Sequence, residues 1–127
     1  GGGGGGDSYV QMNGGANNTN NGVNRYIPLG GNYFDTGSIL VYTEGLCPFD
    51  GVVESVTVRT ANASGSTATK LWVNGSEVNT STDTISAATP ITINFGDSVS
   101  VGDKIAVSMN TANSAGDTHV TVLIKKS

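Results

Sequence analysis

The sequence predicts an all-β fold, an antiparallel β-sandwich of about eight strands with a jelly-roll-like arrangement. The chain of 127 residues holds 19 Gly and only 13% charged residues, a composition that favours strands and turns over helices. Runs rich in Val, Ile and Thr recur at a spacing of roughly 8 to 12 residues. Turn-forming pairs such as Asn74-Gly75 and Gly102-Asp103 separate these runs, as expected between short antiparallel strands.

Composition also limits the classes of partner. The net charge is −4, with only six Lys and Arg, which gives no electrostatic footprint for nucleic acid or anionic lipid. No apolar run approaches the roughly 20 residues of a membrane span, and the N-terminus lacks the charged and apolar regions of a signal peptide. We therefore expect a soluble chain, or the mature or terminal piece of a longer one, with no nucleic-acid or membrane partner.

Residues 1–23 are expected to be a Gly/Asn-rich N-terminal arm outside the sandwich. They carry few apolar groups to offset the entropy of ordering, so the segment should be disordered by itself and held by another subunit or a neighbouring protein. The Gly1–Gly6 run is alternatively a linker. No strand precedes it and no GxxxxGK[ST] pattern occurs, so a phosphate-binding loop is not expected.

Residues 24–127 are expected to form the sandwich, and three strands are expected in its first half. Residues 25–31 predict a short edge strand, because Pro28 removes a ladder donor. Residues 38–43 are apolar on both faces, which predicts a central strand or one beneath a partner surface. Residues 51–60 are the strongest candidate. Their alternation is imperfect, which indicates either a β-bulge near Val53 or a Glu54 side chain that faces a partner.

Hairpins dominate the expected second half. Asn74-Gly75 is the dipeptide that type I′ turns prefer, so the flanking residues 67–73 and 76–78 should pair. A weak strand is expected at 84–87. Apolar residues alternate with polar ones in the remaining expected strands: 90–95, 99–101, 104–110 and 118–125.

The charged and reactive residues predict no catalytic centre, metal site or cofactor. Carboxylates lie mostly beside glycines, where Asp stabilises turns, and the Asp-x-Asp-x-Asp-Gly run of a calcium loop is absent. With 6% aromatic residues, a glycosidase cleft is poorly provided for. Cys47 is the only cysteine and His119 the only histidine, far apart in the sequence. We expect Cys47 to be a buried small residue and His119 to lie on a strand surface, a metal ligand or pH switch near a three-fold axis being the alternative.

Residues that fall off the main alternation are the candidates for a subunit interface. Trp72 points outward if Leu71 and Val73 point inward, which suits either an interface anchor or packing on a second face. The candidate interface residues are Val53, Glu54, Lys70, Trp72 and Leu123.

Several segments together resemble β-rich virion proteins of tailed bacteriophages, in particular those of marine and cyanobacterial phages. The resemblance covers about residues 25 to 125 and is carried by strand and turn signatures. These are Tyr26-Ile27-Pro28-Leu29-Gly30-Gly31, Leu46-Cys47-Pro48-Phe49-Asp50-Gly51 with the strand to Thr60, Gly65-Ser66-Thr67 leading into Lys70-Leu71-Trp72-Val73-Asn74-Gly75, and Val99 to Val107.

The resemblance implies a jelly-roll-like virion module, often a homotrimer, that binds a major capsid or tail protein and carries no catalytic residues. Three roles follow. The first is a capsid decoration or cement protein that binds the particle through its arm and sandwich. The second is a receptor-binding or fibre-tip domain whose loops at 61–66, 81–89 and 111–117 contact host glycans. The third is an extracellular carbohydrate-binding β-sandwich, which should be monomeric with an exposed aromatic platform.

Overall fold

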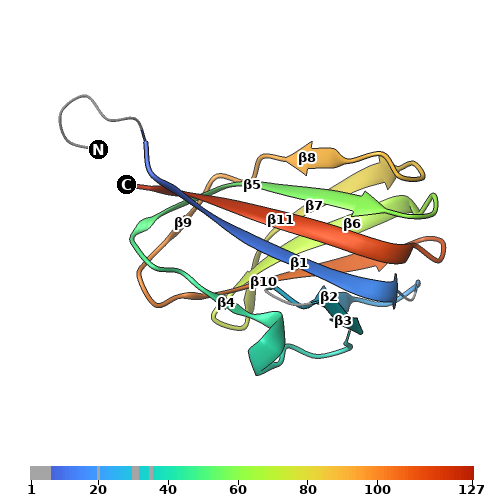
Figure 1. Cartoon of the computed structure of the whole chain (residues 1–127), viewed down its shortest axis with the longest axis horizontal. Helices are drawn as coiled ribbons and strands as arrows, with labels where there is room; N and C mark the ends of the chain where they lie inside the picture. The colour runs from blue at the N-terminus through green and yellow to red at the C-terminus, as the bar shows by residue number, and fades with distance from the viewer. Residues whose placement is uncertain (1–6, 20, 30–31, 35) are drawn as a thin grey trace.

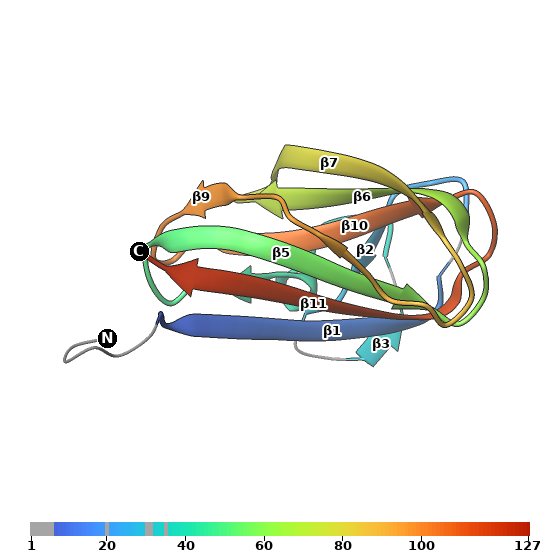
Figure 2. The same ribbon diagram turned by 90° about the horizontal axis from the view of Figure 1, so that it is seen from above.

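The computed structural model describes residues 7–19, 21–29, 32–34 and 36–127. Two β-sheets stack face to face (Figures 1 and 2) and confirm the predicted all-β sandwich. Sheet A runs in the order β3 (Asn32–Phe34), β1 (Tyr9–Thr19), β11 (Gly116–Lys126), β5 (Gly51–Thr60), β8 (Ile91–Ile93), with β9 (Asp97–Val99) also pairing with β5. Sheet B runs in the order β2 (Arg25–Ile27), β10 (Lys104–Thr111), β6 (Gly65–Val73), β7 (Ser76–Ile85), with β4 (Gly45–Leu46) pairing with β10.

The chain passes repeatedly between the two sheets, which gives the strand order of a jelly roll. It runs from β1 in sheet A to β2 in sheet B, returns with β5, crosses again to the β6–β7 hairpin, and ends with β10 in sheet B and β11 in sheet A. Strands β1 and β11, from opposite ends of the sequence, therefore lie side by side (Figure 1). In the described part of the chain, no helix is long and apolar enough to cross a membrane.

The core lies between the sheets and is built from alternate residues of the long strands. Val56 and Val58 of β5, Val122 of β11, and Ile105 and Val107 of β10 are all 0% exposed. Each such side chain contributes about 1.5–3 kcal/mol through burial. The alternating Val/Ile pattern of the sequence thus corresponds to the inner faces of both sheets.

Residues 9–19 differ from the expected arm, because they form β1 within the sandwich. This strand pairs with β11 and with β3, and Ala16 is buried in the core. Its glycines permit close backbone contact: Gly15 N–H donates to the Pro28 carbonyl (3.2 Å), and a Cβ at Gly14 would overlap that carbonyl oxygen. The absence of side chains at these two glycines lets the backbone of β1 lie directly against residue 28. Residues 1–6 and 20 of the expected arm lie outside the described residues.

Residues 38–43 do not form the predicted central strand. Val41–Thr43 is instead a 3-10 helix, η1. The Thr43 hydroxyl accepts from Leu40 N–H (2.9 Å) and donates to the Leu40 carbonyl (2.8 Å), so this short turn is closed by local bonds. Val41 is 91% exposed. The strand prediction was wrong because the apolar run is not buried between the sheets.

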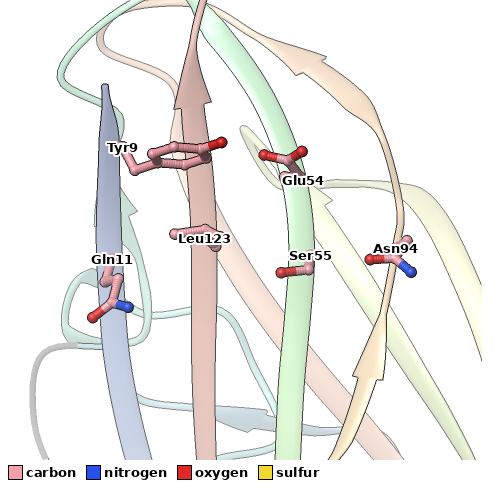
Figure 3. Close-up of a pocket in the computed structure, with 6 residues that line it drawn as sticks. All are labelled: Tyr9, Gln11, Glu54, Ser55, Asn94 and Leu123. Carbon is pink, nitrogen blue, oxygen red and sulfur yellow. The ribbon is translucent and has the colours of Figure 1, made fainter. Parts of the chain in front are cut away.

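The bulge expected near Val53 is present in β5. Leu123 of β11 pairs with Ser55 and Ile124 pairs with Val53, which leaves Glu54 as the extra residue. Val53 consequently faces the core at 0% exposure, while Glu54 and Ser55 both lie on the outer face of sheet A (Figure 3). A bulge re-aims side chains in this way.

The predicted Asn74-Gly75 turn is also confirmed. Asn74 (φ 52°) and Gly75 (φ 81°) both have the positive φ of a type I′ turn. Asn74 Nδ2 donates to Asp103 Oδ1 (3.0 Å), and Asn74 Oδ1 accepts from Lys104 N–H (3.0 Å). Asp103 Oδ2 in turn accepts from Ser100 N–H (2.8 Å). These bonds join the β6–β7 turn to the turn before β10.

Acid should weaken this link between the turns. The Ser100 N–H and the Asn74 amide lower the pKa of Asp103. The carboxylate therefore stabilises the fold fully above its unfolded-state pKa of about 3.9, and this stabilisation is lost as the pH falls through the lower folded-state pKa. We expect Asp103→Asn to reduce the free energy of unfolding at neutral pH, with a difference from the parent that shrinks in acid. Urea unfolding across this range measures it.

Asp117→Asn is the matched control, since the Asp117 carboxylate accepts no hydrogen bond in the described part of the chain. At neutral pH it should change the free energy of unfolding less than Asp103→Asn does, because no hydrogen bond to the carboxylate is lost. A constant Asp103→Asn difference from neutral to strongly acidic pH would contradict the assignment.

Candidate functional site

The outer face of sheet A carries ordered rows of side chains across β1, β11 and β5. Gln11 of β1 lies opposite Leu123 of β11, and Leu123 lies opposite Ser55 of β5. In the next row, Thr121 Oγ1 donates to Asn13 Oδ1 (2.9 Å). Side chains two residues apart share a face, so this surface follows directly from the strand registers.

A hollow lies at the end of this face nearer the N-terminus of β1, and we call it the Glu54 hollow (Figure 3). It is an open depression of about 640 Å³. Leu123 stands at its centre on β11, and the Tyr9 ring extends from β1 across β11 toward Glu54 (Figure 3). Tyr9 is 47% exposed. The residues that line the hollow are Tyr9, Gln11, Glu54, Ser55, Asn94 and Leu123.

Glu54 is the unusual group of the hollow. Its Oε2 atom is buried and has no hydrogen-bond partner within the described residues. A buried polar atom without a partner costs about 1–3 kcal/mol, and more when it is charged. A donor brought by a binding partner would remove that cost, so the Glu54 carboxylate favours an occupied hollow.

A cation flanks the hollow at its outer end. Lys125 Nζ forms an ion pair with Asp7 Oδ2 (3.2 Å). The pKa of Lys125 is raised, first by its bond to Asp7 and by the charge of Asp7, and further by Tyr9 and Glu54. Lys125 therefore stays charged and offsets part of the negative charge of the two carboxylates, Asp7 and Glu54.

The five predicted interface residues do not form one surface. Glu54 and Leu123 come together in the Glu54 hollow. Val53 is 0% exposed in the core, so its prediction as an interface residue was wrong: the bulge turns it inward. Lys70 and Trp72 belong to β6 in sheet B.

Trp72 packs on the outer face of sheet B within its own chain. Its Nε1–H donates to Ser108 Oγ (2.8 Å), and its ring lies 5.4 Å from that of Tyr26, centroid to centroid. Ser108 and Ala106 point away from the core yet are only 0% and 1% exposed. Nearby, Lys70 Nζ pairs with Glu77 Oε1 (3.2 Å). Of the two expectations for Trp72, these contacts favour packing on a second face over an interface anchor.

Trp72→Ala should lower stability and leave the oligomeric state unchanged. The substitution removes the aromatic contact and uncovers Ser108, and we expect a loss of about 2–3 kcal/mol for this half-buried ring. Trp72→Phe retains the ring contact and should lose less. Chemical unfolding and light scattering on both variants provide the measurement, and a reduced mass at unchanged stability would place Trp72 back in an interface.

No protein-family model and no curated protein matches the chain. The side chains themselves indicate what the site can do. Within the described ranges, no three His, Cys, Asp or Glu side chains lie close enough together to hold a metal ion. Cys47 is 2% exposed and its Sγ–H donates to the Phe49 carbonyl (3.0 Å), which confirms the expected buried cysteine. The Glu54 hollow offers an aromatic ring, an aliphatic centre and polar groups, the constituents of a binding surface.

Four residues of the hollow were missed from the sequence. Tyr9 and Gln11 lie in the segment expected to be an arm, although Val10 and Met12 alternate with them and pack against the core. The alternation of outward and core-facing side chains over residues 9–12 was the available signal. The position of Ser55 follows from the bulge, which the break in alternation indicated, whereas Asn94 gave no signal, because its position depends on the pairing of β5 with β8.

Proposed function

We propose that this chain is a structural module of a virion, a capsid decoration or cement protein that assembles as a homotrimer through the outer face of sheet A. The observation that carries the self-association is the Glu54 hollow, where an aliphatic centre and a buried, unpartnered carboxylate oxygen share one open sheet face. The virion role rests on the resemblance of residues 25 to 125 to phage structural proteins.

The composition of this face suits a protein contact. Leu123 is half-buried and Ser55 is 8% exposed, so a partner would complete a surface that is already partly desolvated. Tyr9 adds an aromatic group of the type enriched in interfaces. In the row beside the hollow, the Thr121 hydroxyl already donates to the Asn13 side chain. A partner that covers this row therefore removes fewer hydrogen bonds to water, which lowers the free-energy cost of the contact.

Exposed apolar side chains away from the outer face of sheet A favour a ring over a two-fold dimer. Val41 of η1 is 91% exposed, Leu46 of β4 is 69% exposed, and Val101 is 62% exposed. They belong to segments that bond to or flank sheet B near the start of β10. When two different patches of one chain contact each other between copies, the interface is heterologous, and it forms a ring where the rotation between copies closes. A trimer is the ring that the resemblance implies.

The position of β1 changes the expected mode of particle binding. Residues 9–19 form a strand of sheet A and are therefore not free to act as an arm. The proposed contact with the capsid is made instead by the surface of the sandwich. In the trimer the loops at one end of the sandwich remain available for a capsid or tail protein.

Analysis of purified virions tests the particle role. In density-gradient fractions from the cells that produce this chain, we expect the chain to co-sediment with intact particles, in copy numbers that are multiples of three. Its absence from particles, with the chain found only as free protein, would contradict the virion role and leave the self-association to be judged separately.

The second candidate function is recognition of host glycans at the loop end. It is favoured by the convergence of the predicted loops: Ala61 N–H donates to the Asp117 carbonyl (2.8 Å), and Ala112 N–H donates to the Ser66 carbonyl (3.1 Å). These bonds hold the loops after β5 and β10 together at the end of the sandwich opposite the Asn74 turn (Figure 1).

A further inference from the structure

A second depression lies at the loop end of sheet A, and we call it the Arg59 cleft. It has a volume of about 400 Å³ and is lined by Arg59, Ala61, Ala88, Asp117 and His119. Ala88 N–H donates to the Thr60 carbonyl (2.7 Å), which fixes the β7–β8 loop against the end of β5. Its volume falls within the roughly 300–1,000 Å³ of small-molecule sites.

Arg59 and His119 form a directed pair in this cleft. They are cross-strand partners on β5 and β11, and Arg59 Nη2 lies 2.7 Å from His119 Nδ1. The guanidinium can only donate, so Nδ1 of His119 is the acceptor in this bond and the imidazole N–H is on Nε2. The pair therefore presents further guanidinium N–H donors and one imidazole N–H donor.

The positive charge of Arg59 is not neutralised by an ion pair. In the described part of the chain its side chain bonds only to His119, and no carboxylate lies within 4.0 Å of it. Asp117 lines the same cleft as a separate acceptor. The cleft thus combines a cationic fork, a carboxylate and the methyl groups of Ala61 and Ala88.

We propose that the Arg59 cleft binds a hexuronic acid, a sugar that carries both a carboxylate and neighbouring hydroxyl groups. The guanidinium fork matches a carboxylate through two parallel N–H···O bonds. Asp117 accepts hydrogen bonds from the sugar hydroxyls, and the two alanine methyl groups pack against the apolar ring carbons. Asp117 repels the carboxylate of the sugar and that of a simple anion alike, but only the sugar offsets this repulsion, through hydroxyl groups that donate to Asp117.

This site deepens the glycan-binding candidate and does not depend on the trimer. His119 is four residues from Leu123 along β11, about 13 Å at the rise of a strand. Self-association centred on the Glu54 hollow and sugar binding at the loop end can therefore be tested separately on the full chain.

Titration with D-glucuronic acid, followed by backbone and arginine side-chain ¹H–¹⁵N spectra, tests the proposal. We expect shifts confined to residues 59–61, 88 and 117–119, with a Kd on the order of 1 mM for this exposed, monosaccharide-sized site. D-glucose lacks the carboxylate and should bind at least about tenfold more weakly. Acetate lacks the hydroxyls and should also bind more weakly. Equal affinity for all three ligands, or no shifts with D-glucuronic acid, would overturn the assignment.

Three variants separate a built site from general charge attraction. Arg59→Lys keeps the charge but loses the planar fork, and we expect at least a roughly tenfold loss of D-glucuronic acid affinity. Lys126→Gln removes an exposed charge on the same strand and should leave affinity unchanged. Asp117→Asn should weaken D-glucuronic acid binding and strengthen acetate binding. These opposite effects on the two ligands test the role of Asp117 in a protein that retains Arg59. Equal effects of Arg59→Lys and Lys126→Gln, or an unchanged ligand preference in Asp117→Asn, would overturn the proposal.

Discussion

Leu123→Arg is expected to convert the proposed trimer to monomers while each sandwich stays folded. The side chain stands at the centre of the Glu54 hollow and points away from the core. In the monomer an arginine there extends into solvent. In the proposed trimer the longer, charged side chain would replace the leucine at the centre of the contact, and even beside Glu54 its loss of water and poor fit should cost several kcal/mol. Sedimentation velocity should show loss of the assembled species, and circular dichroism should show an unchanged β spectrum.

Val78→Arg is the matched control on the other sheet. Val78 is the unpaired residue at the register shift between β6 and β7 and is 45% exposed, so the same substitution there should preserve the assembly. If Leu123→Arg left the sedimentation coefficient unchanged, the outer face of sheet A would not be the interface.

Gly14→Ala is expected to destabilise the fold by about 3 kcal/mol or more, through overpacking that the backbone cannot relieve. The added Cβ would overlap the Pro28 carbonyl oxygen, which belongs to the backbone and already accepts a bond from Gly15 N–H. Strand β1 would have to move away from residues 28–29, and with it the buried Ala16. Urea unfolding gives the difference.

Gly37→Ala is the control for the loss of a glycine. Its added Cβ would meet only the Arg25 side chain at 3.5 Å, an ordinary contact, so stability should change little. A Gly14→Ala protein as stable as the parent would show that the close approach of β1 to Pro28 is not required.

Period-two alternation made most of the sandwich predictable. In β10 and β11 the apolar residues alternate with polar ones, and both strands lie where expected because one face of each is buried. The Asn74-Gly75 turn was predictable because few other dipeptides accept its backbone angles. The bulge at Glu54 was visible as a break in the alternation.

Other features depend on contacts between segments distant in the sequence. β1 was missed because Gly and Asn contribute little burial, and its stability comes from pairing with β11 about a hundred residues later. The run at 38–43 was misassigned because the Thr43 hydroxyl bonds to Leu40 decide its local structure. The candidate site combines residues of three strands and the segment after β8, a set that only the sheet order brings together.

Light scattering of the full chain in solution tests the central claim of self-association most directly. We expect a mass three times the 12.8 kDa of one chain. A mass of 12.8 kDa at concentrations well above the micromolar range, the range in which weak interfaces dissociate, would contradict it.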